Sequence, residues 1–144
     1  MSFKTDLATG LKAEDWVVAK LKEEFPTLKR VEEGKLYDLK DDNGFTIEVK
    51  YDRLSERTPN IGIEYLYNGE PSGISTTKAI EWVQIFYLDG EWLYSRNPVD
   101  KLRSFIRCNW DHLDKVDAGD DLRAKIVLIG KDDFANNFHY YEVG

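Results

Sequence analysis

Two carboxylates and a lysine are spaced in residues 36–50 so that they would meet on one face of a hairpin. Residues 42–44 read Asp-Asn-Gly, a favoured tight turn, and apolar residues flank it on both sides. Side chains alternate along a strand, so Glu48 and Lys50 share a face and the pairing would bring Asp38 towards them. Because neighbouring carboxylates repel, a divalent cation with oxygen ligands would relieve the repulsion. Lys50 would then orient or deprotonate an attacking water, or neutralise charge on a phosphate.

The register that produces this convergence is the one that buries the apolar residues of both strands together, namely Tyr37, Leu39, Ile47 and Val49. The alternative interpretation is that Glu48 and Lys50 form a solvent-facing pair on an ordinary amphipathic strand. A short motif leaves both interpretations open until its structural context is known.

At these residues the sequence resembles the PD-(D/E)xK nuclease superfamily, in particular Holliday junction resolvase-like and phage endonucleases. Asp38 matches the family's aspartate and residues 48–50, Glu-Val-Lys, match its E-x-K, although Tyr37 stands where a proline is usual. The resemblance implies a metal-dependent endodeoxyribonuclease in which Asp38, Glu48 and the Val49 carbonyl hold Mg²⁺ or Mn²⁺ and Lys50 is catalytic. It also implies an α/β fold, a restriction-endonuclease-like αβββαβ core with a mixed central sheet, over residues 6–95.

An amphipathic helix is predicted over residues 6–24, with Asp6 or Thr5 as its cap, because its apolar residues recur in steps of three and four. Glu14 falls in this apolar stripe, where an isolated carboxylate is costly. Resolvase-like members of the family add a glutamate from the first helix to the metal site, and Glu14 is the matching residue. The other interpretation places Glu14 at the edge of the stripe, paired with a lysine such as Lys12.

After the hairpin, alternation over residues 61–68 predicts a third strand next to the second, with Glu64 as a candidate further ligand. Residues 75–79 predict the start of a short helix capped by Ser75. The amino end of such a helix favours anions, so Ser75, Thr77 and Lys78 are candidate DNA-binding residues. Residues 72–79 also resemble the segment after the third strand in related nucleases.

The rest of the chain predicts four elements and one exposed loop. These are a hairpin over residues 82–94, a helix starting at Asn97-Pro98, a loop over residues 108–121, and strands over residues 125–129 and 138–143. The helix carries a basic face of Lys101, Arg103 and Arg107, a pattern typical of either a DNA-binding or a solvated surface.

Length and composition predict one cytoplasmic domain, residues 1–144, with no membrane span and, with Cys108 alone, no internal disulfide. The net charge of −7 argues against bulk attraction to nucleic acid, although a nuclease needs only a locally basic groove. A resolvase would be a homodimer, because a junction offers two symmetric scissile sites. The competing hypothesis is a non-catalytic nucleic-acid- or protein-binding module on a nuclease-like scaffold.

Overall fold

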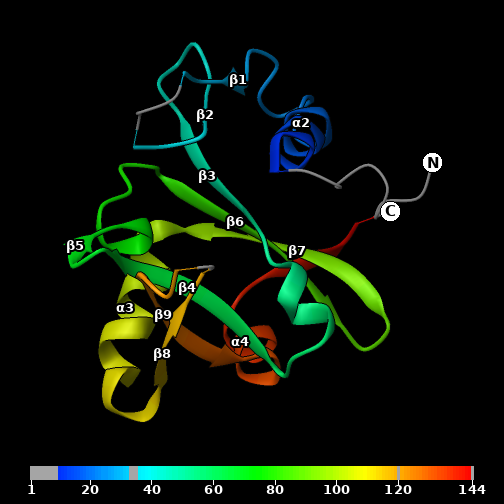
Figure 1. Ribbon diagram of the computed structural model, residues 1–144. Helices are drawn as coiled ribbons and strands as arrows, with labels where there is room; N and C mark the ends of the chain where they lie inside the picture. The colour runs from blue at the N-terminus through cyan, green and yellow to red at the C-terminus, as the bar shows by residue number, and fades with distance from the viewer. Residues whose placement is uncertain (1–9, 33–35, 120, 144) are drawn as a thin grey trace.

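A mixed six-stranded sheet forms the centre of the protein, as the computed structural model shows for residues 10–32, 36–119 and 121–143 (Figure 1). Its strand order is β1-β2-β3-β6-β7-β10, and among the strands of the described residues only β3 and β6 run parallel. The predicted mixed α/β class is therefore confirmed. The strands are β1 (Lys29–Arg30), β2 (Leu39–Lys40), β3 (Thr46–Tyr51), β6 (Glu81–Leu88), β7 (Glu91–Pro98) and β10 (Tyr140–Glu142).

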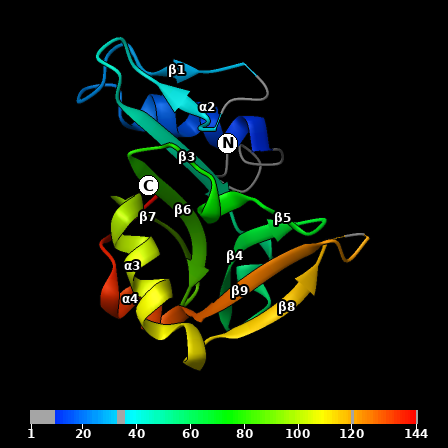
Figure 2. The ribbon, with the colours of Figure 1, turned by 90° about the vertical axis from the view of Figure 1, so that its left-hand side faces the viewer.

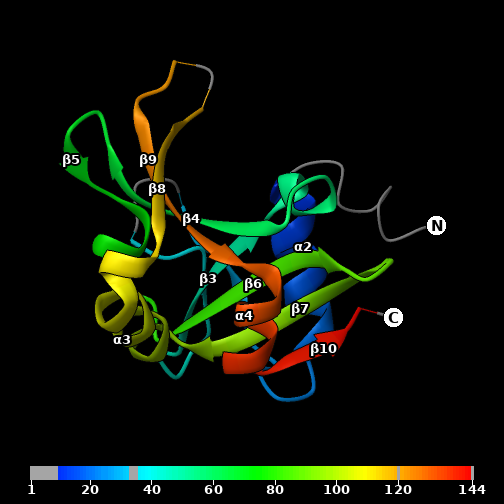
Figure 3. The ribbon, with the colours of Figure 1, turned by 90° about the horizontal axis from the view of Figure 1, so that it is seen from below.

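A second, antiparallel sheet of four strands has the order β5-β4-β9-β8 and extends away from the first (Figure 3). Its strands are β4 (Asn60–Tyr67), β5 (Glu70–Pro71), β8 (Asp114–Ala118) and β9 (Ala124–Gly130). The helices are α2 (Gly10–Lys20), α3 (Val99–Asn109) and α4 (Lys131–Asn137), with short 3₁₀ turns η1 (Arg53–Glu56), η2 (Gly73–Ser75) and η3 (Trp110–His112). None of the described helices is long and apolar enough to cross a membrane.

The first sheet has an apolar core on each face. On one face, α2 packs Ala13 and Val17 against Ile47 and Val49 of β3 (Figure 1). On the other face, the second sheet, α3 and α4 enclose a larger core, which contains Trp82, Phe86, Ile61, Ile63, Leu102, Val127 and Phe134. Because residues of one strand alternate, β3 presents Ile47 and Val49 to α2 and the polar Glu48 and Lys50 to the second layer.

The predicted hairpin over residues 36–50 is present, with Leu39 opposite Ile47. Its turn is held by the buried Asp41, whose carboxylate accepts the backbone N–H groups of Asn43 (3.0 Å) and Phe45 (2.8 Å). One part of the expected register is wrong. Tyr37 packs in the core on the other face from Leu39, because regular pairing begins only at Leu39 and the chain bends before it.

The position predicted for the third strand is wrong. Strand β4 forms where expected, but it pairs with β5 and β9 in the second sheet, while β6 takes the place beside β3. Glu64 alternates along β4 with the buried Ile63, so it lies on the face of its strand opposite the shared core. This orientation does not bring Glu64 towards Glu48.

The later elements are predicted in part. The β6–β7 hairpin, β9 and β10 form as expected, whereas β8 occupies part of the predicted loop over residues 108–121 and α4 has no counterpart in the predictions. Helix α3 begins at Val99 after Pro98, and Asn97 does not cap it. The Asn97 side chain instead bonds to the backbone of His139, because Asn97 is still part of β7.

Helix α2 and the residue that follows it bury a stripe that only partly matches the predicted one. The buried positions are Ala13, Val17 and Leu21, and Glu14 lies beside them at half-exposure. Glu14 therefore sits at the edge of the stripe and not within it. The predicted caps Asp6 and Thr5 and the side chain of Lys12 lie outside the described residues.

Candidate active site

Asp38 lies directly before the first residue of β2 and is hydrogen-bonded to the backbone of β3. Its N–H donates to the carbonyl of Ile47 (3.0 Å), and its own Oδ2 accepts the N–H of Val49 (2.8 Å). Since β2 pairs with β3 only as far as Ile47, the Asp38 carboxylate occupies the position that the next paired residue would have taken. The N–H and C=O of one strand residue point to the same side, so the Val49 carbonyl faces this same edge.

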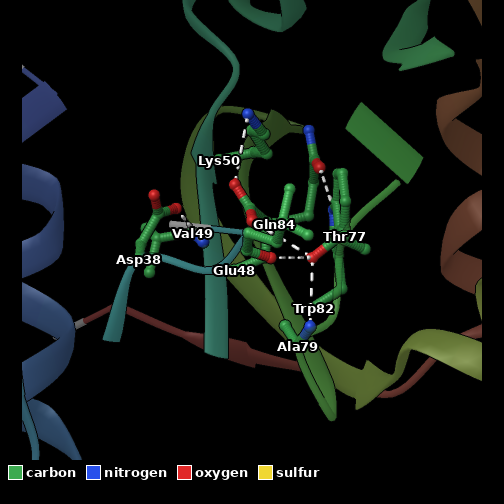
Figure 4. A network of polar contacts seen from close by, with 9 residues as sticks. Asp38, Glu48, Val49, Lys50, Thr77, Ala79, Trp82 and Gln84 are labelled. Carbon is green, nitrogen blue, oxygen red and sulfur yellow. Dashed lines mark hydrogen bonds and ion pairs between the residues drawn. The ribbon is translucent and has the colours of Figure 1, made fainter. Parts of the chain in front are cut away.

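Glu48 follows on the same strand, with its side chain only 12% exposed. Burial, as the larger cause, and the negative charge of Asp38 together raise the pKa of Glu48 to about 7, while Lys50 opposes the shift. The Lys50 Nζ lies 3.4 Å from Oε2 of Glu48, and the hydroxyl of Thr77 lies 3.2 Å from Oε1 (Figure 4). We call Asp38, Glu48 and Lys50 the carboxylate edge of β3.

Lys50 stays accessible, with its side chain 43% exposed. It borders a hollow of about 300 Å³ that is also lined by Arg53, Gly62 and Gln84. The Lys50 ammonium lies 5.9 Å from the centre of the Trp82 ring, and Trp82 donates its indole N–H to Gln84 (2.8 Å). A ligand in this hollow would contact Lys50, whose ammonium is paired with Glu48.

Gln84 was not predicted as a site residue from the sequence. It is 1% exposed and lies beside Lys50 in the register of β6 on β3. The available signal was a single amide within the apolar stretch over residues 81–88, because a buried polar side chain requires a partner.

Glu14 is within electrostatic range of the carboxylate edge but does not complete a ligand cluster. Burial raises the pKa of Glu14, the charge of Asp38 adds to this shift, and Arg30 opposes it. Among the described residues, no group of three or more His, Cys, Asp or Glu side chains is placed so that it could hold a metal ion. Within the described ranges, the candidate ligands at the carboxylate edge are thus two carboxylates and one carbonyl, without a third carboxylate.

The short helix predicted at residues 75–79 is wrong, because no α-helix starts there. The chain makes the 3₁₀ turn η2 and then runs irregularly through Thr77. Thr77 is buried, and its hydroxyl lies within hydrogen-bonding distance of the Leu36 carbonyl and Glu48, while the Lys78 N–H donates to the same carbonyl. Thr77 is therefore a buried hydrogen-bonding partner of the Glu48 carboxylate. Ser75 and Lys78 remain exposed, with the Ser75 hydroxyl donating to the Tyr65 carbonyl.

Comparisons with known proteins assign no family. No protein-family model matches the chain, and a search of curated proteins gives no significant match. Any functional conclusion therefore depends on the chemistry of the site residues themselves.

Proposed function

We propose that the protein is a metal-dependent endodeoxyribonuclease that hydrolyses DNA phosphodiester bonds at the carboxylate edge. One observation carries the proposal. The Asp38 carboxylate is fixed on the Val49 N–H beside Glu48, whose pKa is raised to about 7, and an accessible lysine lies 3.4 Å from that glutamate. Placing two acids together at a cost to stability is typical of a site that exists for function.

The donor set fits a hard divalent cation. Mg²⁺ binds through one or two carboxylates and completes its shell with water and substrate phosphate, so Asp38 and Glu48 with the Val49 carbonyl are sufficient without Glu14. When bound, Mg²⁺ or Mn²⁺ would stabilise charge on the phosphoryl oxygens and lower the pKa of a water. Binding requires both acids to be ionised, so we expect metal binding and loss of the Glu48 proton to be coupled.

Lys50 provides the second element of the chemistry. Its ammonium lies between Glu48 and the hollow lined by Arg53 and Gln84, where a scissile phosphate would be accommodated. A positive charge at this position stabilises the negative charge that develops on phosphorus-bound oxygens as water attacks and the sugar oxygen leaves. Thr77 holds Glu48 by its hydroxyl and is a positioning residue.

The arrangement also supports the finer proposal of a PD-(D/E)xK enzyme with a restriction-endonuclease-like core. Helix α2, the β2–β3 hairpin and the parallel strand β6 follow in the order that this core requires. Strand β4 departs from it by joining the second sheet. Branched DNA as substrate and a homodimer as the active form belong to this resolvase-like proposal.

A non-catalytic DNA- or protein-binding module is the second candidate. The observation that favours it is the absence of a cluster of three candidate ligands within the described parts of the chain. In that case the carboxylate edge would bind no metal, and the protein would bind its partner without cutting it.

The direct test compares Lys50→Ala with Lys40→Ala in a Mg²⁺-dependent DNA cleavage assay. Lys40 is an exposed lysine on the same hairpin and is the matched control. We expect Lys50→Ala to fold normally and to lose cleavage by about 100-fold or more, because the charge opposite the transition state is gone. Lys40→Ala should cut like the wild type. Equal turnover in wild type and Lys50→Ala would remove Lys50 from the chemistry.

A further inference from the structure

A second hollow, of about 360 Å³, is lined by residues of β4, η2, α3 and η3. Figure 2 shows the course of α3 and β4. Apolar and aromatic side chains line it together with Ser75 and two arginines. We call it the aromatic hollow and define it by Tyr65, Ile74, Arg103, Ile106, Arg107 and Trp110.

Two aromatic rings are preorganised in this hollow. The rings of Tyr65 and Trp110 meet edge to face, 5.1 Å apart and at 87°. Both residues are half-buried, so they are held by packing and still have exposed surface. Rings held in this way offer a stacking surface for a flat ligand, and nucleobases stack on aromatic side chains with little regard to sequence.

Three cations surround these rings in a chain whose net charge is −7. Arg103 is fixed by donating to the carbonyls of Ile74 (2.9 Å) and Thr77 (2.7 Å), and the Lys115 ammonium lies 4.5 Å from the centre of the Trp110 ring. Arg107 is exposed and has no hydrogen-bond or ion-pair partner within the described ranges. A free guanidinium beside a stacking surface matches a ligand that combines a base with a phosphate.

The aromatic hollow is connected to the carboxylate edge through one residue. The Thr77 carbonyl accepts a hydrogen bond from the Arg103 guanidinium, and the Thr77 hydroxyl lies within hydrogen-bonding distance of Glu48. The two sites therefore adjoin in the fold, and a nucleic-acid strand is a ligand long enough to contact both.

We propose that the aromatic hollow binds one unpaired base of single-stranded DNA, with the flanking phosphate on Arg107. The inference rests on the proposed nuclease function and extends it to the substrate class, DNA with an unpaired segment beside the cut. In a duplex both faces of a base are covered by its neighbours, so only an unpaired base exposes the face that Trp110 and Tyr65 would contact.

The test is binding of fluorescein-labelled dT12 and of a 12-base-pair duplex by fluorescence anisotropy, with EDTA present so that nothing is cut. We expect Arg107→Glu and Trp110→Ala to weaken dT12 binding about tenfold and to leave duplex binding unchanged, the effect expected for losing one stacked base and its phosphate contact. Lys101→Glu is the matched control, because Lys101 lies on α3 outside this hollow. It should change dT12 binding by less than about twofold.

Trp110→Phe keeps a ring and should restore dT12 binding to within about threefold of the wild type, which separates stacking from folding. Equal dT12 affinity in the wild type and Arg107→Glu, or equal weakening in Lys101→Glu, would overturn the inference. Hollow-dependent dT12 binding without any Mg²⁺-dependent cleavage would support this site and reject the nuclease. Mg²⁺-dependent cleavage of DNA, with dT12 binding unchanged by the substitutions in the hollow, would support the nuclease and reject this site.

Discussion

The carboxylate edge and the aromatic hollow lie on either side of Thr77 but differ in what holds them together. At the edge, two carboxylates lie close together in a partly buried position. Burial and the charge of Asp38 both oppose the ionisation of Glu48 and raise its pKa. In the hollow, rings pack on one another and Arg103 is satisfied by backbone carbonyls. We infer that the edge lowers the stability of the fold and the hollow contributes to it, so mutations in the two regions should shift stability in opposite directions.

The largest effect on stability is expected from Gly73→Ala, in the turn η2 that carries Ile74 of the hollow. Gly73 has a φ of +53°, and an added Cβ would lie 2.2 Å from the Glu64 carbonyl oxygen. The variant should lose about 3 kcal/mol of unfolding free energy, measured by urea denaturation, because backbone must move. Gly69→Ala is the control, since Gly69 also has positive φ (+82°) but open space around its Cβ. It should lose about 1 kcal/mol, and equal losses in the two variants would contradict the packing argument.

A smaller effect of opposite sign is expected from Glu48→Gln in metal-free protein. The folded-state pKa of about 7 lies above the ordinary value of 4.5, so the folded protein holds the proton more tightly than the unfolded chain. The stabilisation of the fold by this bound proton is complete below about pH 4.5 and is lost as the pH rises through 7. At pH 8 the variant should therefore be more stable than the wild type by about 1–3 kcal/mol, with no gain near pH 4.5.

Urea denaturation in EDTA at both pH values measures this difference, with the exposed Glu91→Gln as control. Added Mg²⁺ should stabilise the wild type more than Glu48→Gln, because the variant lacks one ligand. A wild type that is as stable as Glu48→Gln at pH 8 would mean that Glu48 ionises without cost.

The carboxylate edge was predictable because it is local. A turn over residues 42–44 sets the register of two short strands, and alternation then determines which face Glu48 and Lys50 share. The same logic predicted the β6–β7 hairpin. What it missed was Tyr37, because the strand is too short to impose alternation before Leu39.

The region around the hollow was not predictable from local pattern. The helix expected at residues 75–79 fails because the Lys78 N–H and the Thr77 hydroxyl bond to groups about 30–40 residues away in sequence. Strand β4 was predicted correctly as an element but placed in the wrong sheet, since its partner β9 lies far along the chain. The assignment of Glu14 to the apolar stripe failed because the buried face of α2 runs through Ala13 and Val17, which leaves Glu14 at its side.

The most direct test of the central claim is cleavage of linear duplex, single-stranded and four-way-junction DNA with Mg²⁺ or Mn²⁺ by wild type and Asp38→Asn, each beside an EDTA control. Asparagine keeps an oxygen for the Val49 N–H and removes only the charge, so the hairpin should persist. We predict metal-dependent cutting by the wild type, fastest on DNA with an unpaired segment, and a loss of about 100-fold or more in Asp38→Asn. If the folded wild type cleaves none of the three substrates, or if Asp38→Asn cleaves as fast as the wild type, the proposed nuclease activity is contradicted.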